Sequence, residues 1–253
     1  MSLSDRMEKA VRLFCLPRCV SCGELLQPQE NGICGSCRLT YENGKLQNCS
    51  VCFQRISRCT CVPHRLETHY MHRLVKVTRY TPDQETMPSS ALIFALKDDY
   101  RQDVFDFIAD EMVEAISVSV KDPSECLFTN VPRRRAAVLE NGYDHAGILA
   151  QELAKRLGGT YMSLLRSRAK HQQKGMRANE RLRNAAFALR FRFRKADLTG
   201  KHVIVVDDIV TTGASMAAAS VLLHSLGAKE IIGATYAIAY RDAYEPFSHE
   251  DRF

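Results

Sequence analysis

Residues 203–215 read VIVVDDIVTTGAS, and this stretch decides the fold. The run over residues 202–206 is rich in β-branched residues, which predicts a buried strand of a parallel sheet. Two adjacent carboxylates, Asp207 and Asp208, are expected to end that strand. Small and hydroxyl-bearing residues follow, and a helix is predicted over residues 213–226, where the next residue is a glycine. The stretch therefore predicts a strand, a loop and a helix in immediate succession.

The loop of this stretch has the chemistry of an anion site. Helix N-termini attract phosphate through unpaired N–H groups and the macrodipole, and Gly213 lets the backbone approach the anion. Two carboxylates would repel a bare phosphate, but they accept hydrogen bonds from sugar hydroxyls or bind a divalent cation. The implied ligand is a phosphorylated sugar, held by Asp207, Asp208, Thr211, Thr212, Gly213, Ala214 and Ser215. The alternative is an ordinary Thr- or Ser-capped helix, which leaves the Asp pair unexplained.

Strand and helix patterns alternate around this stretch, as in an α/β domain. Strands are expected at residues 75–80, 126–131, 160–165, 186–191 and 231–239, and helices at residues 91–97, 101–116 and 144–157. Alternation of this kind predicts a mainly parallel sheet flanked by helices. Ligands of such sheets bind beyond the carboxyl ends of the strands, which is where the Asp pair is expected.

Eight of the ten cysteines lie between residues 19 and 61, in C-x2-C pairs and a final C-x-C. Four thiolates of this kind hold a tetrahedral Zn2+ at about 2.3 Å. Disulfides are the alternative, disfavoured because nothing marks the chain as secreted. The predicted Zn2+ ligands are Cys19, Cys22, Cys34, Cys37, Cys49, Cys52, Cys59 and Cys61. Sequential and interleaved pairing of the two quartets both remain open from the spacing.

The cysteines divide the chain into two predicted domains. Residues 1–65 form a Cys-rich zinc-binding module, similar to a double zinc ribbon, and residues 66–253 form the α/β domain. With 253 residues, 45% of them hydrophobic and 25% charged, the composition is that of a globular protein. No apolar run approaches the roughly 18 residues of a transmembrane helix, and the charged N-terminus lacks the pattern of a secretory signal. We expect a cytoplasmic protein without membrane insertion.

The basic residues are concentrated in one segment. Residues 165–195 hold eleven Lys or Arg and one Glu, a net charge of +10, although the whole chain carries only +6. A local field of this size favours a polyanionic partner such as a pyrophosphate or a nucleic acid, and a solvated basic loop is the alternative. Three Phe alternate with Arg over residues 187–194, which suits either stacking on bases or an edge strand packed on the core. P-loop and dinucleotide motifs are absent from the sequence.

Residues 203–215 resemble the 5-phosphoribosyl-1-pyrophosphate (PRPP) signature of type I phosphoribosyltransferases. The whole chain resembles the ComF family of bacterial competence proteins, which join a Cys-rich zinc module to a phosphoribosyltransferase-like domain. Further motifs follow in the family's order: Leu96-Lys97 ending a helix, Val131-Pro132 after a strand and Gly142-Tyr143 before a helix. The basic segment follows the family spacing R-x-R-x-T-x-x-Q-x-x-L-x4-R-x-x-N through Arg166, Arg168, Lys170, Gln173, Met176, Arg181 and Asn184.

The resemblance implies roles for these residues. Asp207 and Asp208 would bind the ribose hydroxyls, and residues 211–215 would hold the 5-phosphate. The turn that follows Val131 would be the pyrophosphate loop, with Pro132, Arg133 and Arg134, and Mg2+ would accompany the pyrophosphate. The basic segment would form a hood over the site, through Arg166, Arg168, Lys170, Gln173 and Arg181.

Two departures from the family pattern bear on catalysis. The family's R-G-F-N-Q is N-G-Y-D-H at residues 141–145, and the family Thr is Lys170. They affect catalysis more than sugar-phosphate binding, and no catalytic residue is assigned. Lys97 is expected to be a solvated residue of its helix end.

The family's role predicts a part in natural transformation and DNA uptake. It implies binding of PRPP or a related sugar phosphate, binding of single-stranded DNA, and a competence helicase as a partner. An active phosphoribosyltransferase with an unknown acceptor is the alternative.

Overall fold

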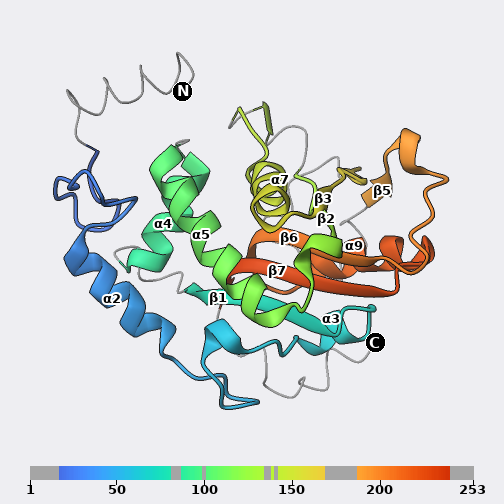
Figure 1. The fold of residues 1–253 in the computed structure, drawn as a ribbon, viewed down its shortest axis with the longest axis horizontal. Helices are drawn as coiled ribbons and strands as arrows, with labels where there is room; N and C mark the ends of the chain where they lie inside the picture. The colour runs from blue at the N-terminus through green and yellow to red at the C-terminus, as the bar shows by residue number, and fades with distance from the viewer. Residues whose placement is uncertain are drawn as a thin grey trace.

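The computed structural model describes residues 17–80, 87–98, 101–133, 138–139, 142–168 and 187–239. Its centre is a five-stranded sheet with the strand order β1-β7-β6-β2-β3, and every pair in it is parallel (Figure 1). The strands are β1 (Arg73–Tyr80), β2 (Leu127–Asn130), β3 (Thr160–Tyr161), β6 (His202–Val210) and β7 (Glu230–Ala239), and a separate antiparallel pair consists of β4 (Leu165–Ser167) and β5 (Phe187–Leu189).

Helices cover both faces of the sheet, which is why its strands are apolar on both sides. Val203 and Val205 of β6 point into one core, and Ile204 and Val206 point into the other. The core that contains Ile204 and Val206 also includes α4 (Pro88–Asp98), α5 (Gln102–Ser119), α7 (His145–Leu157) and part of α2 (Gly35–Lys45). The core that contains Val203 and Val205 also includes α3 (His64–Glu67) and α9 (Ala214–Ser225). Short 3-10 turns lie at Ile56–Arg58, Pro123–Glu125 and Phe191–Phe193.

Most of the predicted elements are present, and the fold class is confirmed. The predicted end of the central strand is wrong, because β6 continues through the Asp pair to Val210. Ile209 pairs with Ala237 of β7, and Val210 with Ile238, so β7 is long enough to extend the ladder. The Asp pair therefore lies within the strand, two residues before its end.

The predicted strands on either side of the basic segment are shorter than expected. The strand predicted over residues 160–165 is divided between β3 and β4. The strand predicted over residues 186–191 ends at Leu189. Phe191–Phe193 form a 3-10 turn instead, and the Phe191 side chain is 81% exposed. The alternating Phe and Arg residues therefore do not continue an edge strand.

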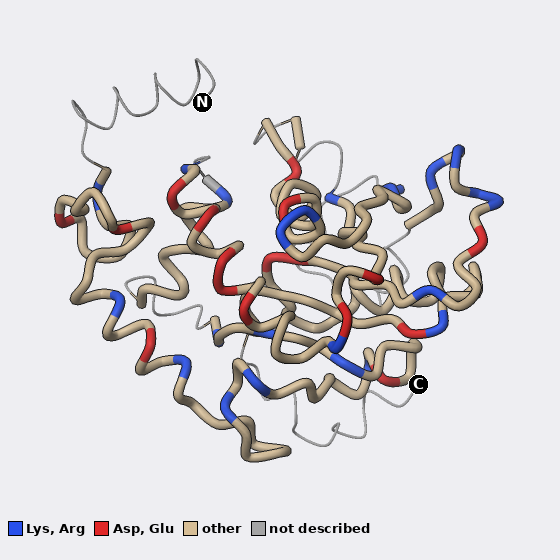
Figure 2. The backbone as a smooth tube through the Cα atoms, viewed as in Figure 1, with Lys and Arg blue, Asp and Glu red and all other residues tan. Residues whose placement is uncertain are grey.

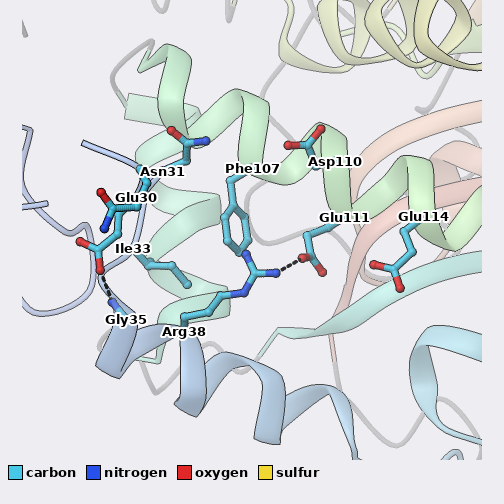
Figure 3. A pocket seen from close by; sticks show the side chains of 10 residues that line it. Glu30, Asn31, Ile33, Gly35, Arg38, Phe107, Asp110, Glu111 and Glu114 are labelled. Atoms are coloured by element: carbon cyan, nitrogen blue, oxygen red, sulfur yellow. Dashed lines mark hydrogen bonds and ion pairs between the residues drawn. The ribbon is translucent and has the colours of Figure 1, made fainter. Parts of the chain in front are cut away.

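The Cys-rich segment packs on α5. Leu26, Ile33 and Tyr41 are buried in the same core as Phe107. A cavity of about 380 Å³ lies at this contact and is lined by side chains of α2 and α5, with Arg38 above the ring of Phe107 (Figure 3). None of the helices in the described part of the chain is long and apolar enough to span a membrane.

The contact between α2 and α5 includes a buried carboxylate. Glu111 on α5 is only 5% exposed. It accepts a hydrogen bond from Arg38 at 2.8 Å, one from the Tyr41 hydroxyl at 3.1 Å and one from the Lys45 ammonium. Three donors from α2 thus meet one charge on α5, so this buried carboxylate is both paired and hydrogen-bonded.

Candidate sugar-phosphate site and metal centres

The loop between β6 and α9 is shaped for an anion. Gly213 caps α9 with φ of +72° and has no side chain to bond the helix start, and the Thr212 hydroxyl accepts from the N–H of Ala214 only at 3.5 Å. The first-turn N–H groups of α9 therefore retain donor capacity toward a ligand. A small cavity lies in this loop, lined by Asp207 and by the residues from Ile209 to Met216. All seven predicted sugar-phosphate residues thus meet at the end of β6, with Asp208 paired as described below.

The two carboxyl groups of β6 differ in acidity. Burial and the neighbouring Asp208 raise the pKa of Asp207 well above its usual value. Burial also opposes ionisation of Asp208, but the Lys97 ammonium and a hydrogen bond from Asp207 outweigh it and lower the pKa of Asp208. Asp208 is therefore the more acidic member of the pair, and the two carboxyls lose their protons in separate steps.

Lys97 reaches the site from the end of α4. Its Nζ lies 3.4 Å from Oδ2 of Asp208, whose side chain is 13% exposed. The expectation that Lys97 is merely solvated is wrong, because the carboxyl end of β6 faces the end of α4. A cation thus lies at the point where a phosphorylated ligand and the Asp pair would meet.

The end of β2 lies next to the Asp pair. Asn130 of β2 is level with Val206 of β6, so the next two residues, Val131 and Pro132, follow at the level of Asp207 and Asp208, and Arg133 comes directly after them. The charge of Arg133 contributes to lowering the pKa of Asp208, which places this predicted pyrophosphate-side cation in the electrostatic neighbourhood of the pair. Arg134 lies outside the described residues.

Sequence reasoning missed the polar residues that fix the start of α7. Asp144 caps this helix by accepting from the N–H of Gly147 at 3.2 Å, and its other oxygen accepts from the Asn130 amide. Tyr161 donates to Asn130 at 3.0 Å. Asp144 was visible only as a departure from the family pattern. Asn130 and Tyr161 gave no sequence signal, because their pairing depends on the neighbouring strands β2 and β3.

His145 lies at the first turn of α7 and is buried, with an exposed fraction of 1%. Within the described part of the chain, neither ring nitrogen has a hydrogen-bond partner. Burial and the charge of Arg133 lower the pKa of His145 to about 4, so the ring is neutral at physiological pH. His145 is therefore part of the buried packing at the start of α7.

The predicted hood is only partly described. Arg166 lies in β4 and Arg168 directly follows it, and both are exposed. Lys170, Gln173 and Arg181 lie outside the described residues. Beyond β5, basic residues continue along the segment that leads to β6 (Figure 2). Arg192 lies over the ring of Phe193 and Arg194 over that of Phe191, so arginine and aromatic surfaces are presented together.

The eight predicted zinc ligands form two compact quartets in chain order. The sulfur atoms of Cys19, Cys22, Cys34 and Cys37 lie within 4.8 Å of one another, and so do those of Cys49, Cys52, Cys59 and Cys61. Tetrahedral Zn2+ with sulfur at about 2.3 Å needs sulfur atoms about 3.8 Å apart. Each quartet can therefore hold a metal ion, and an interleaved pairing does not fit the geometry. None of the nine cysteines in the described residues is in a disulfide.

One cysteine of each quartet is poised as a thiolate. A hydrogen bond from Ser36 lowers the pKa of Cys34 to about 6. Burial would raise the pKa of Cys49, but backbone N–H groups of Cys52 and Val51 lower it to about 7. Thiolates are the form that binds metal, so both quartets have the donor chemistry of a zinc centre.

Comparisons with known proteins identify the kind of domain that contains the loop between β6 and α9. A family described as "Phosphoribosyl transferase domain" matches residues 136–251. The DNA utilization protein YhgH of Salmonella typhi is 28% identical, over 79% of this chain and 94% of that protein. Competence protein F of Haemophilus influenzae is 24% identical, over 85% and 93%, and competence protein ComFC of Streptococcus pneumoniae is 23% identical, over 85% and 96%.

Solved structures are similar at low identity. A purine phosphoribosyltransferase from Pyrococcus horikoshii has a TM-score of 0.35 and 18% identity, over 56% of this chain and 92% of that one. A hypoxanthine phosphoribosyltransferase from Staphylococcus aureus has a TM-score of 0.37 and 13% identity, over 55% and 73%. The strand order and the match to the family confirm a phosphoribosyltransferase-like domain.

Proposed function

From its kinship with the ComF family of competence proteins, we propose that this chain acts in DNA uptake or utilisation and binds PRPP or a related sugar phosphate. The observation that carries the proposal is the meeting of three features at the end of β6. These are the Asp pair, the Lys97 cation and the uncapped start of α9. A phosphate alone would not need the carboxylates, whereas a ribose 5-phosphate uses all three.

Each feature has a counterpart on the ligand. Asp207 and Asp208 would accept hydrogen bonds from the ribose hydroxyls, which repays their burial. The N–H groups at the start of α9 and the nearby Thr211 and Thr212 would hold the 5-phosphate. Arg133, with Pro132 and Arg134, would face the pyrophosphate. Mg2+ bound with the ligand would neutralise part of the pyrophosphate charge, and carboxylate oxygen is the donor type that Mg2+ prefers.

Single-stranded DNA is the second proposed partner, bound through the basic segment at residues 165–195. Arg190, Arg192 and Arg194 are exposed beside the β4–β5 pair, and the last two lie against aromatic rings. Cationic side chains neutralise phosphates, and an exposed ring such as that of Phe191 provides a stacking surface for a base. Arg166, Arg168, Lys170, Gln173 and Arg181 would close over the sugar-phosphate site. We place this activity in the cytoplasm, with a helicase of the competence machinery as the protein partner.

The decisive experiment is isothermal titration of the full chain with PRPP and Mg2+. Saturable binding of one PRPP per chain is expected, with much weaker binding of ribose lacking the 5-phosphate. Absence of PRPP binding under conditions where the protein is folded and zinc-loaded would overturn the sugar-phosphate proposal.

An active phosphoribosyltransferase is the alternative, and the cations Lys97 and Arg133 near the Asp pair favour it because they suit a pyrophosphate leaving group. The same sample separates the two functions. Pyrophosphate release from bound PRPP, in the presence of candidate acceptor bases or DNA, indicates an enzyme. Binding without release indicates a device that senses or holds the sugar phosphate.

A further inference from the structure

Lys76 is a buried lysine in the β1 strand. It is 1% exposed. Its ammonium donates to the carbonyl oxygens of Cys59 at 3.0 Å, Cys61 at 2.8 Å and Leu74 at 3.3 Å. These three bonds use every proton of the ammonium group, so the side chain is held in one place.

Within the part of the chain that the structure describes, the charge of this lysine has no carboxylate partner. No Asp or Glu of the described residues lies within ion-pair distance of its ammonium. Carbonyl dipoles satisfy its hydrogen bonds, but they do not supply a compensating negative charge. An isolated buried ammonium is costly, so proteins pair such groups or leave them uncharged.

The second cysteine quartet lies where the missing charge is needed. Two of the carbonyls that hold Lys76 belong to Cys59 and Cys61, whose sulfur atoms are members of that quartet. Four thiolates around Zn2+ carry a net charge of −2, whereas two disulfides would carry none.

We propose that Lys76 is the counter-cation of a dianionic tetrathiolate metal centre formed by Cys49, Cys52, Cys59 and Cys61. It is a positioning residue, since it acts through the backbone of two ligands and through their charge. The first quartet is built differently. There the carbonyls of Cys19 and Cys34 accept backbone N–H groups of Gly23 and Arg38.

The consequence is that the second metal centre is connected to the sheet. Lys76 lies in β1, which pairs along its length with β7, and β7 pairs with β6. When the second quartet holds a metal ion, the charge of Lys76 in the buried strand β1 is compensated. Without the metal ion, that charge is not compensated. This inference is independent of the proposed function, because it concerns metal affinity and stability and not PRPP.

The test is Lys76→Met in the full chain, with Lys45→Met as the matched control. Both changes remove one ammonium from the region near the Cys-rich segment, but Lys45 bonds to Glu111 and not to a cysteine carbonyl. Competition with a chromogenic chelator should show two zinc ions per chain. In Lys76→Met one zinc should be released about tenfold more readily and the other unchanged, while Lys45→Met should retain both affinities.

Thermal stability provides a readout that a purely structural role would not give. With zinc bound, Lys76→Met should melt below the wild-type chain, because the dianionic centre has lost its counter-cation. After chelation the order should reverse, because the variant no longer buries an uncompensated charge. If the zinc affinities of Lys76→Met equal those of wild type, the proposal is overturned. If the zinc-free variant does not fold well enough to melt, the chelator competition alone decides.

Discussion

The ammonium of Lys97 lies 3.4 Å from the carboxylate of Asp208, across 111 positions of sequence. This contact joins the end of α4 to the end of β6 and separates the acidities of the two adjacent aspartates. The cation and a hydrogen bond from Asp207 lower the pKa of Asp208 against the effect of burial, whereas burial and the neighbouring Asp208 raise the pKa of Asp207. The site is thus electrostatically asymmetric before any ligand arrives.

Replacing Asp207 and Asp208 together by Asn should abolish PRPP binding without unfolding the chain. Each charged acceptor lost from a ligand hydroxyl is worth roughly 1.5–3 kcal/mol. Asn keeps the shape and the polarity of the side chain, so circular dichroism and melting should stay close to wild type. Titration calorimetry measures the affinity, and undiminished binding by the double variant would remove the Asp pair from the site.

PRPP affinity should rise with pH through the range in which Asp207 loses its proton. The pKa of this carboxyl is raised in the free protein, so at low pH the ligand must displace a proton to bind. Binding should therefore release protons, which calorimetry detects by repeating the titration in buffers of different ionisation enthalpy. Asp207→Asn has no such proton, and its affinity should vary with pH only as the ligand's own phosphates titrate. If the wild-type chain and Asp207→Asn release the same number of protons on binding, the protons come from PRPP and not from Asp207.

Gly213→Ala should weaken the phosphate loop. At φ of +72° an alanine costs roughly 1–2 kcal/mol, and its Cβ would lie 3.1 Å from the Leu66 side chain. We expect a lower melting temperature and a loss of PRPP affinity. Gly44→Ala in α2 is the control, because a Cβ there meets nothing within 4 Å. That change should be neutral or stabilising by about 0.5–1 kcal/mol. An unchanged melting temperature in Gly213→Ala would show that the loop tolerates a side chain.

Replacing Arg190, Arg192 and Arg194 by Ser should weaken binding of single-stranded DNA of any sequence, because phosphate contacts do not read bases. Each phosphate contact contributes about −0.7 to the slope of log affinity against log salt, so the triple variant should lose about two units of slope. Fluorescence anisotropy at several salt concentrations measures this. The rival surface is the Cys-rich segment, tested by changing Arg55, Arg58 and Arg65 to Ser. If only the second triple variant loses binding, the basic segment is not the DNA site.

Metal analysis of the purified chain should find two zinc ions. Cys22→Ser and Cys61→Ser should each leave one, because the two quartets share no ligand. Chelation should lower the melting temperature of the whole chain, since Cys19 and Cys34 are buried in the core that also contains α5. Absence of zinc together with absence of free thiols would favour disulfides instead.

The sequence allowed the loop between β6 and α9 and the grouping of both cysteine quartets to be predicted, because their members are close neighbours along the chain. The resemblance to the ComF family is also confirmed by the curated relatives. The pairing of Lys97 with Asp208 was not predictable, since it depends on where two distant elements end in space. The length of β6 was misjudged because two charges suggested a strand end. The β-branched Ile209 and Val210 that follow were the signal for continuation.

Lys76 illustrates the same limit. In a strand that alternates polar and apolar residues, a lysine is expected to face solvent. In the structure β1 is buried on both faces from Leu74 to Thr78, because the Cys-rich segment covers the sheet there. Local periodicity indicates which face of the strand a residue occupies. Only the tertiary packing decides whether that face is exposed to solvent.

The buried carboxylate Glu111 has a consequence for the history of this chain. Its partners Arg38, Tyr41 and Lys45 all belong to α2, in the Cys-rich segment. A descendant that lost this segment would leave the carboxylate without these partners but in contact with water, so the charge itself would cost little. The larger cost would come from apolar residues of α5 such as Phe107, which now lie in the shared core. A relative without the cysteines but with the sheet should therefore keep a charged or polar residue at position 111 and carry a polar residue in place of Phe107, and sequence surveys can look for that change.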